Sequence, residues 1–145
     1  MKIGNKRISQ FKLEEKLEAG IVLLGSEVKA ARLGHADITG SYVKIIGNEA
    51  YLVGAKIFPY KFSRIEGYDE KRTRKLLLHK KELLVLKSRL DQGNFTLVPT
   101  ALYLKNGNFK LEIALGKGTK EHERRKNAKQ KVLNRVQERE LKNFT

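Results

Sequence analysis

Apolar and polar residues alternate near the end of the main body of the chain. Every second position from residue 109 to residue 115 is apolar: Phe109, Leu111, Ile113 and Leu115. This period of two predicts a strand that buries one face. Asn106-Gly107 precedes the strand and supplies the positive φ angles of a tight hairpin turn. Residues 97–105 are therefore predicted as the partner strand, with Pro99 at an edge or a bulge because proline has no N–H to donate.

Further strands are predicted upstream of this hairpin. Apolar runs between turn residues indicate strands at residues 21–24, 42–46 and 50–57, and a short one at residues 11–13. Gly47-Asn48 predicts a second hairpin, which joins residues 42–46 to residues 50–57.

Two helices interrupt the strands. The first is predicted at residues 27–33, with Ser26 as its N-cap and Gly34 as its end. The second is longer, at residues 70–90, with Asp69 as its N-cap and Gly93 as its terminator. Its apolar face consists of four residues at helical spacing: Leu76, Leu83, Leu86 and Leu90.

The order of elements predicts a mainly β fold with helices. Strands, a long helix and two final strands are the order of an OB-fold, a closed barrel with its main helix between the third and fourth barrel strands. Period and order alone leave an SH3-like barrel or an α+β sandwich open.

The composition changes after residue 116. Residues 1–116 form the predicted OB-fold body, and residues 117–145 form a basic tail with few sizeable apolar residues: Val132, Leu133, Val136, Leu141 and Phe144. This apolar area is too small to offset the entropy of ordering a free segment. The tail is therefore predicted to be disordered when free, with helical potential at residues 127–142 because Pro and Gly are absent there.

The charge points to a polyanionic partner. The 145 residues include 31 Lys and Arg against 16 Asp and Glu, a formal net charge of +15. Such an excess repels itself in a compact chain, and nucleic acid is the favoured counterpart. An anionic membrane is less suited, because no long basic amphipathic stretch carries a face rich in Trp or Phe. Residues 1–7 lack an apolar run and no stretch approaches the roughly 20 residues of a membrane span, so a cytoplasmic location is expected.

The sequence favours a binding protein over an enzyme. The absence of cysteine excludes disulfides, zinc ribbons and thiol catalysis. His35, His79 and His122 are not at metal-ligand spacing, and no local Ser/His/Asp or paired-carboxylate arrangement is present. No catalytic residue, metal or cofactor is predicted.

A collinear series of motifs resembles the SmpB family over nearly the whole chain. The longest motif is residues 72–82, Arg-Thr-Arg-Lys-Leu-Leu-Leu-His-Lys-Lys-Glu. The others are Asn5-Lys6-Arg7, Glu18-Ala19-Gly20-Ile21, Gly25-Ser26-Glu27-Val28-Lys29 with Arg32, Ser41-Tyr42-Val43, Tyr103-Leu104-Lys105-Asn106-Gly107 and Gly116-Lys117-Gly118. The departures are small: Gly40, Thr119, the Glu123-Arg124 pair, and Leu133 where many members carry Trp.

The resemblance implies an RNA-binding adaptor for trans-translation. In such a protein an OB-fold body grips the elbow of the tRNA-like domain of tmRNA and delivers it to stalled ribosomes. The tail then enters the vacant mRNA channel of the small subunit and becomes helical there. The implied partners are tmRNA, the ribosome and a GTP-bound elongation factor on the same tmRNA, and a monomer without a membrane partner is expected.

The resemblance also implies two sets of site residues. The tmRNA-binding set is Asn5, Lys6, Arg7, Glu18, Tyr42, Arg72, Arg74, Lys75 and Leu77. The set for the decoding centre and mRNA channel is Lys120, His122, Glu123, Arg124, Arg125, Lys129 and Lys131.

Purely structural interpretations of these residues remain open. Residues 5–7 also fit a frayed terminus, Glu18 a surface turn, and Tyr42 core packing. Leu77 fits either a helix packed on several sides or an exposed contact for an unstacked base. Arginine and lysine on the first turns of the predicted long helix lie at the positive end of the helix dipole, where a positive charge is unfavourable. This placement favours a role in phosphate binding over a merely solvated surface. The tail also fits a permanent ribosomal extension, and the whole chain fits a structural ribosomal or initiation-type OB protein. A nucleic-acid-modifying enzyme would require a metal or cofactor site that the sequence does not suggest.

Overall fold

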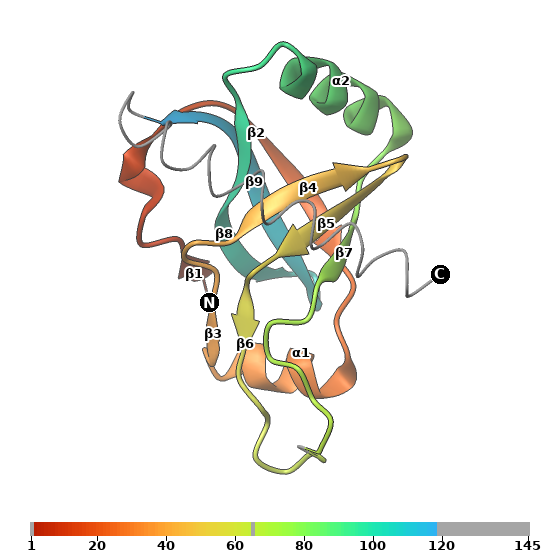
Figure 1. Ribbon diagram of the computed structural model, residues 1–145. Coiled ribbons are helices and arrows are strands. Elements are labelled where there is room, and N and C mark those ends of the chain that lie inside the picture. The colour runs from red at the N-terminus through yellow and green to blue at the C-terminus, as the bar shows by residue number, and fades with distance from the viewer. Residues whose placement is uncertain (1, 65, 119–145) are drawn as a thin grey trace.

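Strands make up most of the structure, a computed structural model that describes residues 2–64 and 66–118 (Figure 1). Two α-helices, α1 (Gly25–Arg32) and α2 (Lys80–Asp91), and one 3-10 turn, η1 (Ile8–Gln10), accompany the strands in these residues. The strands are β1 (Lys2–Gly4), β2 (Phe11–Ile21), β3 (Ala36–Asp37), β4 (Tyr42–Ile46), β5 (Glu49–Val53), β6 (Lys56–Ile57), β7 (Arg74–Leu77), β8 (Thr96–Lys105) and β9 (Asn108–Gly118). The predicted mainly β class with helices is confirmed.

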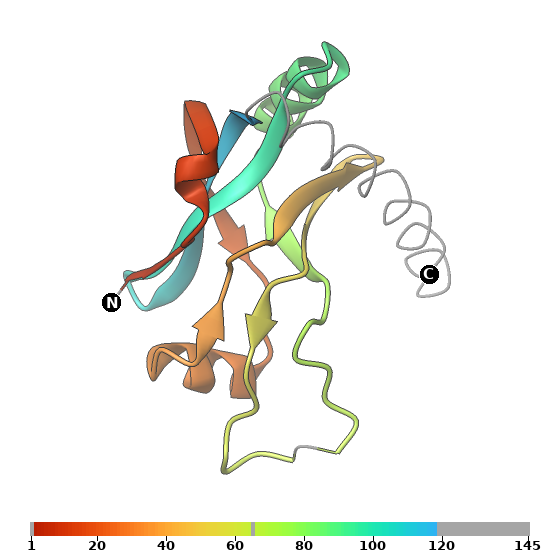
Figure 2. The same ribbon diagram turned by 60° about the vertical axis from the view of Figure 1, so that its left-hand side comes forward.

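The strand pairings run from β8 through β4, β5, β7, β2 and β9 and back to β8. Seven strands pair in the order β1-β8-β4-β5-β7-β2-β9, and β9 also pairs with β8. All of these pairings are antiparallel. β3 and β6 form a separate two-stranded sheet. In both views α1 and the connection from β6 to β7 lie at the lower end, and α2 lies at the upper end (Figures 1 and 2).

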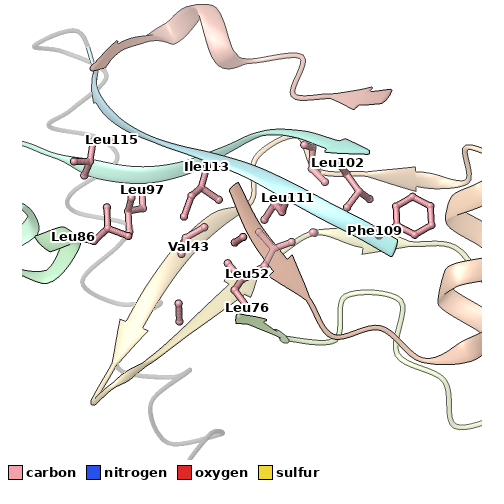
Figure 3. Close-up of a cluster of buried hydrophobic side chains, with 14 of the residues drawn as sticks. Val43, Leu52, Leu76, Leu86, Leu97, Leu102, Phe109, Leu111, Ile113 and Leu115 are labelled. Atoms are coloured by element: carbon pink, nitrogen blue, oxygen red, sulfur yellow. The ribbon is translucent and has the colours of Figure 1, made fainter. Parts of the chain in front are cut away.

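The core lies inside the ring of strands (Figure 3). The four residues that alternate along β9 are all buried, as their period of two predicts. Leucines from several elements meet them: Leu52, Leu76, Leu86, Leu97 and Leu102. Each fully buried Leu contributes roughly 1.5–3 kcal/mol relative to an exposed one.

The predicted turns are confirmed. Asn106 and Gly107 have φ angles of 52° and 81°, and they connect β8 to β9. Gly47 has a φ of 62° between β4 and β5. The register of β8 against β9 shifts between Pro99 and Ala101, so the proline lies at a bulge as expected.

The long helix predicted at residues 70–90 is wrong in its first half. Residues 74–77 form β7, where Arg74 and Leu76 are buried while Lys75 and Leu77 are exposed. This period of two matches the pairing of β7 with β5 and β2. The helix begins only after His79, whose backbone N–H donates to Glu82 Oε1 at 3.0 Å. The apparent helical face therefore combined residues of a strand and of a shorter helix.

The other boundaries shift by a few residues. β2 runs unbroken from Phe11 to Ile21, so it absorbs the short strand predicted at 11–13 and leaves most of 21–24 outside. Gly54, with a φ of 85°, divides the strand predicted at 50–57 into β5 and β6. α1 begins at Gly25, so its N-cap is Leu24 and not the predicted Ser26, and the Leu24 N–H donates to Glu27 Oε1 at 2.8 Å.

Side chains from β2, from α2 and from the segment before β8 surround the end of β9. β9 continues through residue 118, two residues beyond the expected body, and pairs there with Phe11 and Lys12. Lys117 Nζ lies 3.9 Å from Glu14 Oε1 and 4.8 Å from the centre of the Phe95 ring. Arg89 lies over the same ring and pairs with Glu14 and Glu15. The predicted disorder of the tail lies outside the described residues.

Candidate nucleic-acid interface

The outer surface of the sheet presents one row of residues across four strands. Leu77 of β7 is paired with Gly20 of β2, Gly20 with Lys110 of β9, and Lys110 with Tyr103 of β8. Their immediate neighbours on the same strands are buried, so the row faces outward: Ala19, Leu76, Leu102 and Leu111. We call this row, together with Glu18 and Lys105, the β7–β8 face.

Glu18 is held as a carboxylate on this face. The Tyr103 hydroxyl donates a hydrogen bond to Glu18 Oε2, and Lys105 Nζ lies 3.3 Å from the same oxygen. The hydrogen bond from Tyr103 and the charges of Lys105 and Lys110 lower the pKa of Glu18. Burial and the bond to Glu18 raise the pKa of Tyr103 to about 12, so its hydroxyl keeps its proton. The result is an oriented anion, able only to accept hydrogen bonds, among lysines.

Leu77 is exposed, with 54% of its surface accessible. It lies against the backbone of β2, because a Cβ built on Gly20 would be 3.2 Å from Leu77 Cβ. A larger residue at position 20 would therefore displace the leucine. Of the two alternatives for Leu77, the outward position is the one observed, and it comes from the alternation of a strand.

Lys75 lies on the outer side of the same strand. Its Nζ is 3.0 Å from Glu49 Oε1 in an exposed ion pair, and Glu49 also accepts a hydrogen bond from the Tyr51 hydroxyl. An exposed pair of this kind contributes little to stability. The lysine is therefore available to exchange Glu49 for a phosphate.

Arg74 is fully buried and belongs to an ion cluster around Glu27. Glu27 Oε2 accepts from Arg74 Nη2 at 2.6 Å and from Nε at 3.0 Å, and Glu27 Oε1 accepts from Arg72 Nη2 at 2.6 Å. The remaining donors of Arg74 meet backbone oxygens of Ala55, Arg72 and Glu70. Arg74 thus offers no surface for a direct RNA contact, contrary to the expectation from its motif. Arg72 keeps 32% of its side chain exposed.

Burial and ion pairing act in opposite directions on Glu27. Desolvation raises its pKa, whereas the hydrogen bonds from Arg72 and Leu24 and the charge of Arg74 lower it further, so the net shift is downward. The Tyr68 hydroxyl oxygen lies 3.2 Å from Glu27 Oε2. The cluster ties α1 to the segment that enters β7.

Residues 5–7 are ordered against β8, so they do not form a frayed end. Asn5 Nδ2 donates to the Pro99 carbonyl at 2.8 Å, and its backbone N–H donates to the Thr100 carbonyl at 3.1 Å. Asn5 is buried and its Oδ1 accepts the Arg7 N–H at 2.9 Å. The side chain of Asn5 is therefore engaged within the protein, while Lys6 and Arg7 are exposed.

The remaining predicted residues lie away from the β7–β8 face or outside the described part of the chain. Tyr42 is buried, with 8% of its surface exposed, but it lies outside the core cluster that contains its neighbour Val43. Lys2 pairs with Tyr103 and Gly4 with Ala101, so Asn5 lies three residues, about 10 Å, along the strand from the β7–β8 face. Tyr103, Lys105 and Lys110 are face residues that the predicted site omits, although Tyr103 and Lys105 lie in one of the motifs. The outward alternation along the last hairpin is the signal that could have identified them. Lys120, His122, Glu123, Arg124, Arg125, Lys129 and Lys131 lie outside the described residues.

The described residues add neither a metal site nor a membrane-spanning helix. Residues 2–64 and 66–118 contain no group of three or more His, Cys, Asp or Glu that could hold a metal ion. In the same part of the chain, neither helix has the length and apolar character to cross a membrane.

Known proteins resemble this chain over most of its length. The sequence profile of a family described as SmpB protein matches residues 3–143. An SsrA-binding protein of Oleidesulfovibrio alaskensis is 46% identical over 131 residues, which cover 90% of this chain and 84% of the relative. One of Aquifex aeolicus is 44% identical over 135 residues, covering 92% and 86%. A solved structure described as "tmRNA-SmpB: a journey to the center of the bacterial ribosome" matches with a TM-score of 0.69 and 39% identity, over 82% of this chain and 85% of the other.

Proposed function

The chain belongs to the SmpB family, and from this premise we propose that it is an RNA-binding adaptor for trans-translation. It binds the tRNA-like domain of tmRNA and delivers it to stalled ribosomes, where its tail probes the empty mRNA channel. The observation that carries the proposal is the β7–β8 face, where an oriented carboxylate and an exposed leucine lie among lysines. Sequencing the RNA that co-purifies with the tagged protein tests the proposal, and one dominant tmRNA is expected. Equal retention of the protein on every ribosome would instead indicate a structural ribosomal protein.

Each group on the β7–β8 face has a chemical role toward folded RNA. Leu77 packs on the flat surface of an unstacked base, supported by the backbone at Gly20. Glu18 accepts hydrogen bonds from base amino or imino groups, which phosphates cannot provide. Lys105 and Lys110 meet the backbone phosphates, which position the RNA without reading its sequence.

The N-terminal segment adds a second basic contact. Lys6 and Arg7 are exposed beside the loop at residues 39–40, where the Lys6 N–H donates to Thr39 Oγ1 at 3.1 Å. We assign phosphate contacts to Lys6, Arg7, Lys75 and the exposed part of Arg72. Asn5, Tyr42 and Arg74 support these residues from inside the body.

The ring of pairings from β8 through β4, β5, β7, β2 and β9 supports a closed barrel of the OB type. In this assignment the chain acts as a monomer in the cytoplasm, and a GTP-bound elongation factor occupies the same tmRNA. It acts by binding and not by catalysis. The tail residues Lys120, His122, Glu123, Arg124, Arg125, Lys129 and Lys131 contact the decoding centre and mRNA channel.

Replacing Glu18 by Ala is expected to weaken tmRNA binding by roughly tenfold, because a charged hydrogen-bond acceptor for bases is lost. Affinity for an unrelated structured RNA should not fall. Lys6→Ala is the matched comparison, since it should weaken both RNAs and flatten the salt slope by roughly one unit. The measurement is a salt titration of each variant against both RNAs. Equal losses on the two RNAs for Glu18→Ala would remove its role in specificity.

A chain ending at residue 118 is expected to fold and to bind tmRNA almost as tightly as the full chain. The reason is that the β7–β8 face and the N-terminal segment both lie within residues 2–118. Affinities are compared at one salt concentration, because phosphate contacts make them salt-dependent. Loss of tmRNA binding in a truncated chain that keeps its thermal unfolding midpoint would contradict this division of roles.

A further inference from the structure

The connection between β6 and β7 carries exposed aromatic rings. Phe62 is 76% exposed and Phe58 is 40% exposed, and both lie in residues 58–64, which we call the aromatic loop. This loop projects at the end of the molecule that carries α1 (Figures 1 and 2). Contiguous exposed apolar groups rimmed by polar residues mark interaction sites.

The rings are arranged with cations beside them. Tyr60 and Phe62 meet edge to face, with ring centres 5.5 Å apart and an interplanar angle of 67°. Lys61 Nζ lies 5.1 Å from the centre of the Phe62 ring, and Lys29 Nζ of α1 lies 5.6 Å from that of Tyr60. Arg64 is exposed at the end of the loop. Aromatic faces next to positive charge are the combination that binds unpaired nucleotides.

The loop is anchored at its base. The Ile57 N–H donates to the Glu70 carbonyl at 3.0 Å, and the Tyr68 hydroxyl donates to the Ile57 carbonyl at 2.7 Å. Within the loop, the Ser63 N–H donates to the Tyr60 carbonyl at 3.0 Å and closes a turn. The rings are therefore presented on a braced turn, which lowers the entropy lost when a ligand binds.

We propose that the aromatic loop is a second RNA-binding site, where an unpaired nucleotide of the tRNA-like domain stacks on Phe62 and flanking phosphates meet Lys61 and Arg64. The proposal rests on the function proposed above. The net charge of +15 favours a polyanion over an uncharged apolar partner. The loop leads into β7, which carries Leu77 of the β7–β8 face. Acidic residues at positions 66, 69 and 70 confine the RNA to the first half of the connection.

The test is binding of the full chain to a transcribed tRNA-like domain of tmRNA at one salt concentration. Phe62→Ala should weaken binding between about fivefold and about 150-fold, the range for loss of one stacked base. Phe62→Leu should weaken it as well, because leucine keeps apolar area but has no ring face. Phe62→Trp should bind as tightly as the wild type. Ultraviolet cross-linking followed by mass spectrometry should attach a nucleotide within residues 60–62.

Leu77→Ala in the same assay separates this proposal from the proposed function. If Leu77→Ala weakens binding and Phe62→Ala does not, the function stands and the aromatic loop is not an RNA site. If neither variant weakens binding, both proposals fail. If Phe62→Leu binds the RNA as tightly as the wild type does, stacking of a base on Phe62 is excluded. A membrane is the alternative ligand, and anionic phosphatidylglycerol vesicles test it. If Phe62→Ala abolishes binding to these vesicles and leaves the affinity for RNA unchanged, the assignment of the aromatic loop to RNA is wrong.

Discussion

Replacing Glu27 by Gln is expected to lower the free energy of unfolding by about 3–5 kcal/mol, because it leaves the buried Arg74 without its counter-ion. The free energy of unfolding of a small domain is about 5–15 kcal/mol in total, so this one substitution removes a large part of it. Arg74 is 0% exposed and Glu27 is 1% exposed, so water cannot replace the missing charge. Urea unfolding followed by far-ultraviolet circular dichroism measures the change.

Glu49→Gln is the matched control for this prediction. It breaks the exposed pair between Glu49 and Lys75, and little measurable change in stability is expected. Equal unfolding midpoints for Glu27→Gln and the wild type would show that the cluster contributes nothing to the fold.

The same cluster predicts how the stability depends on pH. The folded-state pKa of Glu27 is lowered from 4.5, so its contribution is present above that value and is lost as pH falls through the folded pKa. The wild type should therefore lose stability on acidification below about pH 4.5, and the deficit of Glu27→Gln relative to it should shrink over the same window. A deficit that stays constant down to the acid transition would contradict this assignment.

Local signals in the sequence predict the turns and the last hairpin well. Asn106-Gly107 and the alternation along β9 are properties of neighbouring residues, and both are observed as predicted. The first half of the long helix is wrong because three adjacent leucines fit either period, and the pairing of β7 with β5 decides between them. That pairing joins Leu76 to Ala50, far apart in the chain, so no local window contains it.

The candidate site depends even more on distant pairs. Glu18 and Tyr103 are 85 positions apart, and Glu27 and Arg74 are 47 apart. The motifs single out Glu18 and Arg74 as RNA contacts, but only the folded chain shows that Tyr103 orients the first and that Glu27 buries the second. A charged residue in a motif can therefore serve the scaffold and not the ligand.

Deletion of residues 119–145 is expected to leave tmRNA binding almost intact and to reduce peptidyl transfer to tmRNA-borne alanine by more than about tenfold. We propose that the tail acts after tmRNA is bound, and folds only when ribosomal RNA surrounds it. Its basic residues suit a channel lined with phosphates: Lys120, Arg124, Arg125, Lys126, Lys129, Lys131 and Arg135. Val132, Leu133 and Val136 give a stripe too short to hold a helix alone in water.

The body supports this mechanism at the point where the tail begins. Lys117 is fixed by Glu14 and by the ring of Phe95, so the tail starts from a defined place on the body. In both views β9 ends away from the aromatic loop (Figures 1 and 2). A tail that starts at the opposite end from that loop can enter the ribosomal channel while the body holds tmRNA.

Point variants locate the effect within the tail. His122→Ala removes the ring proposed to stack on a decoding-centre base, and alanines at Arg124 and Arg125 remove charges for flanking phosphates. Both variants should bind tmRNA as the wild type does and should slow peptidyl transfer on ribosomes stalled on truncated messages, measured at saturating protein. A tail with the same composition in scrambled order is the control for charge alone, and it should not restore transfer. A segment that reads the empty channel is required once the complex has reached the ribosome. Wild-type transfer rates from the tail-deleted chain would therefore contradict this mechanism and would show that the protein only carries tmRNA.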